Sequence, residues 1–376
     1  MNIFHNFIHS NEIFVKPNDW ISIKENYSQE FIIKQLSDAI VEYNIKLPYQ
    51  IITHQDMVDS YNDLMNFDSL TLIKNGKWVS KFEYKYHFNE IYIDLSSVGA
   101  KASNYFHQVE RWKCDATGYP SPQKTWEKER FRITLLKALF SLKVSEINPH
   151  ILRNIISLRK YIAPQFRPSA AKAIYDYFKA ERVLDFSMGW GDRLLAAHTS
   201  KYVKKYIGFD PNKNLYSGYL SQIEEYNKLN LLKKEFVLYP LCAEDENIDL
   251  SNEQFDLIFT SPPYFDKEKY DQSDRQSYKR YKKFDDWLNN FLCKTIELRI
   301  KNLKVGGYLV INISDIYTRK KLYKICDGMN NFIHNNLPDM KYIGAIGYRM
   351  PKRPQSISSD QVGIYGEPMW VYQKIS

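Results

Sequence analysis

The sequence predicts an α/β protein built on a doubly wound, mostly parallel sheet. From about residue 166 to the end of the 376-residue chain, short apolar runs alternate with helix-like runs, as they do where crossover helices join parallel strands. A turn with two glycines follows the first apolar run, and the fourth run, FDLIFT, has the composition of a buried strand. These observations favour one large α/β domain in this part of the chain.

Seven strands are expected in this domain, most of them separated by helices. The expected strands are residues 182–186, 205–209, 235–241, 255–260, 308–313, 342–350 and 368–373. The expected helices are residues 169–179, 192–199, 215–229 and 284–300. The first helix opens near Pro168, whose missing N–H costs nothing in a first helical turn.

The earlier part of the chain lacks this alternation, so we expect a separate N-terminal α+β region at residues 1–155 and the α/β domain at residues 156–376. Residues 78–94 alternate like two strands with a break between them, and residues 130–144 indicate an amphipathic helix. Residues 105–126, rich in aromatic, basic, Pro and Gly residues, are expected to form a loop.

Charge and cysteine usage narrow the class of protein and its compartment. Lys and Arg number 52 against 44 Asp and Glu, a formal net charge of +8, which permits a polyanionic partner without requiring one. The cysteines have neither metal-finger spacing nor the number of a disulfide scaffold, so no metal is expected; they are Cys114, Cys242, Cys293 and Cys326. With no signal-peptide pattern and no apolar run of about 18 residues, we expect a cytoplasmic protein, or one in the host cytoplasm if its source is viral.

Two segments at the start of the domain have the features of a ligand-binding edge. In VLDFSMGWGDRL, residues 183–194, an apolar strand ends at Asp185, and Gly189 and Gly191 form the turn into a helix. Glycines at this place let a ligand approach the backbone closely. In IGFDPN, Asp210 ends the next strand, 19 residues after Gly191, where its oxygens could hold ribose hydroxyls. The alternatives are a structural turn and a helix N-cap.

The segment FDLIFTSPPYF, residues 255–265, points to the chemistry most directly. A strand runs straight into Ser261, Pro262, Pro263 and Tyr264. Prolines fix the backbone and have no N–H, so carbonyls at the strand end are left as outward acceptors. Ser261 adds a hydroxyl and Tyr264 a flat face for stacking. The combination suits a planar ring that carries an amino group; the alternative is a Pro-Pro turn without function.

These segments resemble the DNA amino-methyltransferases, which methylate N4 of cytosine or N6 of adenine. Residues 165–178 are similar to the family's motif before the cofactor loop, DFSMGWGDRL to the loop itself, and TSPPY to the catalytic tetrapeptide with its strand. The resemblance spans about residues 165–373, somewhat over half of the chain. It implies a class I methyltransferase fold, Rossmann-like, and S-adenosylmethionine as cofactor.

The resemblance also implies roles for single residues. The catalytic group would be Ser261, Pro262, Pro263 and Tyr264. The cofactor would lie against Phe166, Asp185, Phe186, Gly189, Gly191, Asp210 and Ala243. The chain departs from the family at Cys242, where Asp or Ser is usual, and at Phe186 and Ser187, where Pro and Phe are usual. Adenine recognition could therefore fall to the backbone or to Glu244 and Asp245.

DNA recognition has to come from outside these motifs, because the gap before TSPPY leaves no room for a large recognition domain. The N-terminal region and loops are the candidates. One loop, residues 265–283, carries seven Lys and Arg against four Asp and Glu, with four aromatic residues. Basic groups hold phosphates and aromatic rings stack on unpaired bases, although a solvated loop or ordinary packing is the alternative. The candidate contacts are Phe265, Arg275, Lys279, Arg280, Arg111 and Trp112.

The sequence thus predicts methyl transfer from S-adenosylmethionine to the exocyclic amine of a base in DNA, either single-stranded or flipped out of a duplex. Ser at position 261 favours N4 of cytosine over N6 of adenine. The alternatives are a methyltransferase-fold DNA-binding module whose catalytic site has decayed, and an RNA base methyltransferase. A dinucleotide-dependent oxidoreductase lacks support, because the third glycine of that fingerprint is missing. The recognition sequence, the oligomeric state and a partner restriction nuclease are left open.

Overall fold

The computed structural model describes residues 1–230, 232–351 and 363–376 and divides the chain into two compact units. The first unit comprises residues 1–51 and 108–164, and the second comprises residues 52–107 and 165–376. Within the described residues no helix is long and apolar enough to cross a membrane.

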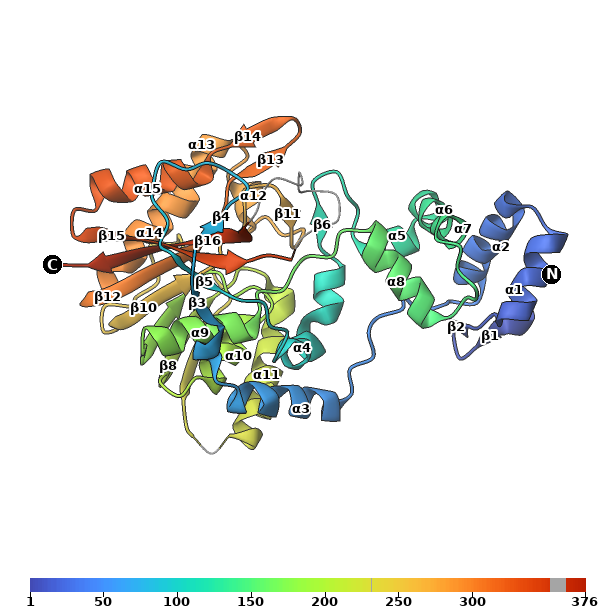
Figure 1. Ribbon diagram of the computed structural model, residues 1–376, viewed down its shortest axis with the longest axis horizontal. Helices are drawn as coiled ribbons and strands as arrows, with labels where there is room; N and C mark the ends of the chain where they lie inside the picture. Colours follow the sequence, from blue (N-terminus) through green and yellow to red (C-terminus); the bar gives the residue numbers. More distant parts are fainter. Residues whose placement is uncertain (231, 352–362) are drawn as a thin grey trace. The chain divides into compact units, whose positions relative to one another are not determined.

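The second unit is built on the predicted doubly wound sheet (Figure 1). Its seven principal strands follow the order β9-β8-β7-β10-β12-β16-β15. Their bounds are β7 Arg182–Asp185, β8 Lys205–Phe209, β9 Glu235–Tyr239, β10 Phe255–Thr260, β12 Leu303–Asn312, β15 Met340–Arg349 and β16 Ile364–Lys374. The strands from β9 to β12 are mutually parallel, and β16 runs antiparallel to both of its neighbours. The predicted fold class is therefore confirmed.

Helices lie on both sides of this sheet (Figure 1). Along one side run α9 Pro168–Tyr177, α10 Asp192–Thr199 and α11 Tyr216–Leu229; along the other run α13 Phe284–Trp287, α14 Lys294–Arg299 and α15 Ile325–Asn336. The first three match the predicted helices closely. The predicted helix at 284–300 is interrupted by a π-helical turn at Leu288–Cys293, and α15 was not predicted.

Three short strands from the earlier part of the chain extend the sheet. They are β3 Ile73–Asn75, β4 Trp78–Val79 and β5 Ile91–Ile93. β5 pairs with β15 and β4 pairs with β16. Trp78 is buried against Gly347, where a Cβ would come within 2.6 Å of its ring. Residues 52–107 thus pack with the α/β domain, which differs from the boundary predicted at residue 155.

The first unit is mostly helical. Its helices include α1 Pro17–Asn26, α2 Gln29–Glu42, α5 Pro122–Glu127, α6 Glu129–Leu136, α7 Ala138–Ser141 and α8 Pro149–Arg159. The loop predicted at 105–126 is wrong, because α4 Ala100–Trp112 and α5 occupy much of it. Two of the aromatic residues that suggested a loop are core residues: Trp112 and Trp126 are buried in the same cluster as Trp20.

Candidate active site

The two segments that carry the predicted chemistry begin side by side. β7 and β10 are parallel neighbours, with Val183 opposite Leu257 and Leu184 opposite Ile258. The Thr260 hydroxyl donates to Asp185 Oδ1 at 3.0 Å, which joins the ends of the two strands. The strand order reverses between β7 and β10, and doubly wound sheets bind ligands in the crevice at such a point.

Asp185, the last residue of β7, holds the turn that follows in place through hydrogen bonds. Its carboxylate is fully buried and accepts from Arg193 Nε at 2.7 Å, from the Tyr206 hydroxyl at 2.9 Å and from the Ser187 N–H at 3.1 Å. Phe186 is likewise buried in the core of the domain. Both residues were predicted to border the cofactor, and their contacts in the described part of the chain hold the shape of the turn.

The two glycines of this turn share a left-handed backbone, with φ of +60° at Gly189 and +72° at Gly191. They differ in what surrounds the position of a Cβ atom. A Cβ at Gly189 would meet nothing nearer than the Ser187 carbonyl at 3.9 Å, so this face of the turn is open. A Cβ at Gly191 would come within 2.3 Å of Gln222 Oε1 and 2.9 Å of His107 Nε2. Gly191 is therefore needed for packing, whereas Gly189 leaves a face of the turn open to a ligand.

This difference predicts opposite outcomes for two matched variants. Gly191→Ala should lower the free energy of unfolding by roughly 2 kcal/mol or more, because strain and overlap add. Gly189→Ala should cost only about 1 kcal/mol of stability yet weaken S-adenosylmethionine binding, because the methyl group covers the open face. Thermal unfolding and equilibrium dialysis measure the two effects. Unchanged cofactor affinity in Gly189→Ala would remove this turn from the binding site.

Asp210 directly follows β8 and contacts the open glycine turn that follows β7. Its Oδ2 accepts the Gly189 N–H at 3.0 Å, and its Oδ1 accepts the Asn212 N–H at 2.9 Å. Burial raises the pKa of this carboxyl to about 7, although the two backbone N–H groups act in the opposite direction. Two bonds leave lone pairs free on both oxygens. Asp210 can therefore accept ribose hydroxyls while it holds the turn.

A pKa near 7 makes cofactor binding depend on pH in a definite direction. The protonated carboxyl is the weaker acceptor, so affinity should rise as the pH rises through 7. The ionised fraction of a group with this pKa grows about tenfold between about pH 6 and pH 8, and the binding constant should grow by about the same factor. Isothermal titration calorimetry of the wild type and of Asp210→Ala at several pH values tests this. Any protonation of the ligand itself affects both proteins equally, so the difference between them reports on Asp210. A parallel pH dependence in the variant would contradict the role of Asp210.

The Ser-Pro-Pro-Tyr segment leaves β10 at the same edge of the sheet. Ser261 and Pro263 are partly exposed, while Pro262 and Tyr264 are buried. The Ser261 hydroxyl lies 3.4 Å from Asn312 Oδ1 at the end of β12. Lys267 Nζ lies 5.0 Å from the centre of the Tyr264 ring, so one face of that ring already accepts a cation. A serine hydroxyl, proline-bounded carbonyls and an aromatic face are thus grouped beside the glycine turn.

Sequence reasoning missed Glu367, which lies against this segment. The Tyr264 hydroxyl donates to Glu367 Oε2 at 3.2 Å, and burial raises the pKa of the Glu367 carboxyl. The bond fixes the tilt of the tyrosine ring. Glu367 follows Tyr264 by 103 residues, so no local spacing could have singled it out.

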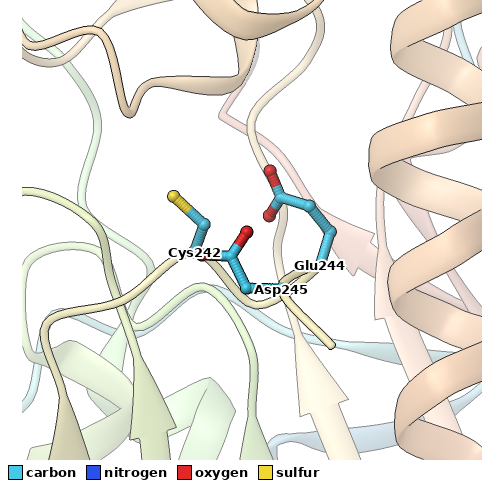
Figure 2. Close-up of side chains that lie close together, drawn as sticks. All are labelled: Cys242, Glu244 and Asp245. Carbon is cyan, nitrogen blue, oxygen red and sulfur yellow. The ribbon is translucent and has the colours of Figure 1, made fainter. Parts of the chain in front are cut away.

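The turn after β9 carries the predicted adenine-side residues. Ala243 is buried, and the Cys242 thiol donates to the Arg275 carbonyl at 3.3 Å. Figure 2 shows Cys242, Glu244 and Asp245 together on this turn. The thiol sulfur and one oxygen of each carboxylate, atoms of the kind that bind metals, lie within 4.8 Å of one another. Both carboxylates bind Arg280 Nη1, at 2.7 and 3.0 Å. The cluster is an ion pair that ties this turn to α12 Ser277–Arg280.

Several predicted nucleic-acid contacts have structural roles instead. Phe265 is buried against Phe284, Trp287 and Tyr323, and Trp112 is buried against Tyr49. The structure thus gives these two rings packing roles, in place of the predicted contacts with bases. The basic candidates also have partners within the protein: Arg280 pairs with Glu244 and Asp245, Arg111 donates to the Ala163 carbonyl, and Lys279 lies 3.8 Å from Asp274.

Phe166 lies over the same edge from the segment before α9. Its ring stacks on Tyr348 with centres 4.8 Å apart, meets Phe259 of β10 edge-on, and has the Arg193 guanidinium 5.3 Å from its centre. Phe166 is partly exposed, so it keeps surface for a ligand. The open glycine turn, the Asp210 acceptors and this ring fit the shape and donors of S-adenosylmethionine.

The strand order is that of the class I methyltransferase fold, and this grouping of residues could hold S-adenosylmethionine. A family model described as DNA methylase, of the N6/N4 type, matches residues 255–375. This match, and the relative described next, support the resemblance to the N4/N6 DNA methyltransferases that the sequence predicted.

Other comparisons cover only part of the chain. The Type II methyltransferase M.MjaVI of Methanocaldococcus jannaschii is 35% identical over 94 residues, which are 24% of this chain and 41% of the relative. The chain thus covers less than half of that protein's length. Among solved structures, TrmN from Thermus thermophilus has a TM-score of 0.36 at 16% identity. The match covers 58% of this chain and 51% of the TrmN chain. An rRNA methylase from Streptococcus thermophilus has a TM-score of 0.33 at 16% identity, over 57% of this chain and all of its own.

Proposed function

We propose that this protein transfers a methyl group from S-adenosylmethionine to the exocyclic amine of a base in DNA, with N4 of cytosine favoured over N6 of adenine. The observation that carries the proposal is the contact between Thr260 and Asp185. It brings the base of the glycine turn next to the start of the Ser-Pro-Pro-Tyr segment. A cofactor on the turn and an amine at the segment would lie close enough for direct transfer.

The residues of the segment orient the amine. The Pro262 carbonyl and the Ser261 hydroxyl accept its hydrogens, and Tyr264 stacks on the ring. The nitrogen lone pair then faces the glycine turn. S-adenosylmethionine, when bound, supplies a methyl group activated by its sulfonium. Positioning of this kind can account for much of the barrier reduction.

On this proposal the chain needs no strong base before transfer. The amine gains a positive charge only as the new bond forms, and its proton leaves afterwards to solvent. Asp210 is committed to Gly189 and Asn212 and holds ribose hydroxyls. The preference for cytosine rests on Ser261, because the adenine-specific enzymes of the family more often have Asp or Asn at this position.

The test is incubation of the protein with DNA and methyl-labelled cofactor, followed by digestion to nucleosides and chromatography. The expected product is N4-methyldeoxycytidine. N6-methyldeoxyadenosine would reverse the base preference but keep the enzyme class. No labelled nucleoside from DNA, together with saturable cofactor binding and labelled RNA, would move the proposal to the RNA alternative. No cofactor binding at all would favour the decayed DNA-binding module.

A further inference from the structure

The loop after β12 forms a hairpin whose tip has an uncommon backbone. β13 Ile316–Thr318 pairs antiparallel with β14 Lys321–Tyr323, so Arg319 and Lys320 alone make the turn. Both have left-handed backbones, with φ of +49° and +62°. Two-residue turns of this kind favour Asn-Gly, because other residues are strained there. Each non-glycine residue costs about 1 kcal/mol or more, which points to a role for these two side chains.

The hairpin and the Ser-Pro-Pro-Tyr segment lie at the same edge of the sheet. It follows β12, in which Ile311 is opposite Thr260 of β10. Arg319 Nη2 pairs with Asp266 Oδ2 at 2.9 Å, and the Tyr323 ring lies 5.3 Å from that of Phe265. Phe265 and Asp266 directly follow Tyr264 in the chain, so the hairpin is anchored on the segment that would orient the base.

The outward surface of the hairpin is basic with an apolar pair. Residues 316–324 carry four Lys and Arg and no Asp or Glu: Arg319, Lys320, Lys321 and Lys324, all of them exposed. Tyr317 and Leu322 are opposite each other, so their side chains share one face. They are 61% and 40% exposed. Cations beside an exposed aromatic residue are what proteins present to a nucleic-acid backbone and to its unpaired bases.

We propose that the β13–β14 hairpin contacts DNA beside the target base, with Arg319 and Lys320 on backbone phosphates and Tyr317 toward the bases. The proposal rests on the proposed function. Figure 1 shows the hairpin in orange near α13, whose Phe284 ring lies 5.1 Å from the Tyr323 ring of β14. Arg319 can keep its bond to Asp266 and still reach a phosphate, because a guanidinium has five donors. A strained turn thereby holds two cations at fixed positions near the reaction.

The test replaces the tip by the relaxed pair, as Arg319→Asn with Lys320→Gly. A matched control, Lys301→Ser with Lys341→Ser, removes two exposed charges where β12 and β15 begin, at the opposite edge of the sheet. A second variant, Arg319→Lys with Lys320→Arg, keeps the charges. Binding to a mixed-sequence DNA duplex is followed by fluorescence anisotropy across a series of KCl concentrations, with cofactor affinity and thermal unfolding measured in parallel.

The Asn-Gly variant should bind DNA about tenfold more weakly, and the slope of log K against log salt should fall by about 2, the value for two lost phosphate contacts. Its cofactor affinity should be unchanged and its thermal midpoint equal or higher. The control and the charge-keeping variant should bind as the wild type does. An Asn-Gly variant with wild-type affinity and slope would overturn the proposal while wild-type methylation of DNA still stood. Failure of the wild type to bind or methylate DNA would instead overturn the proposed function, and this inference with it.

Discussion

Replacement of Tyr264 by alanine is expected to lower turnover about 100-fold at saturating cofactor, with S-adenosylmethionine affinity kept within about twofold. The ring is the flat surface on which the target base would stack, and loss of an aromatic stack costs roughly 1–3 kcal/mol per base. Poor alignment of the amine adds to that loss. The glycine turn and Asp210 are left in place. Single-turnover assays and calorimetry measure the two quantities.

A conservative variant separates stacking from packing, because Tyr264 is buried and its truncation also removes core contacts. Tyr264→Phe keeps the ring and loses only the hydroxyl bond to Glu367, so turnover should fall less than about tenfold. Thermal unfolding of both variants reports any loss of packing. Equal turnover in the wild type and the folded alanine variant would remove Tyr264 from the active site.

Replacement of Asp210 by alanine is expected to weaken S-adenosylmethionine binding by roughly 10- to 100-fold, the effect of losing hydrogen bonds to a charged acceptor. The carboxylate accepts the Gly189 and Asn212 N–H groups, and on our proposal it also accepts ribose hydroxyls. The chemical step involves neither task directly. Turnover at saturating cofactor should therefore stay within a few-fold of the wild type, and KM should carry the change.

An exposed carboxylate elsewhere provides the control for this variant. Asp274 lies on the surface, and Asp274→Ala should leave both KM and turnover unchanged. If Asp210→Ala bound the cofactor as tightly as this control, ribose recognition would have to come from another residue. A fall in turnover with unchanged KM would instead place Asp210 in the chemical step.

The parts of the site that the sequence predicted are those set by local structure. β7, the glycine turn and α10 follow one another within 18 residues, and the strand, turn and helix signals are all local. The same holds for β10 and the Ser-Pro-Pro-Tyr segment. Because carboxyl ends of parallel neighbours share one edge of a sheet, the pairing of β7 with β10 brings Asp185 and Thr260 together.

The parts that the sequence did not predict depend on contacts between distant segments. β4 and β5 are two and three residues long, and they gain their hydrogen bonds from β16 and β15 near the other end of the chain. Glu367 reaches Tyr264 in the same way. Phe265 and Trp112 have the composition of a nucleic-acid surface, but their rings supply core packing. Composition alone does not separate an aromatic ring that stacks on a base from one that fills a core.

The most direct test of the account is a crystal structure of the complex with S-adenosylhomocysteine. The account predicts the sulfur above the open face of Gly189, the ribose on Asp210, and a clear path from the sulfur to the Pro262 carbonyl and Ser261. A ligand bound elsewhere in the domain, or one whose sulfur is screened from Ser261 by protein, would contradict direct transfer between the glycine turn and the Ser-Pro-Pro-Tyr segment.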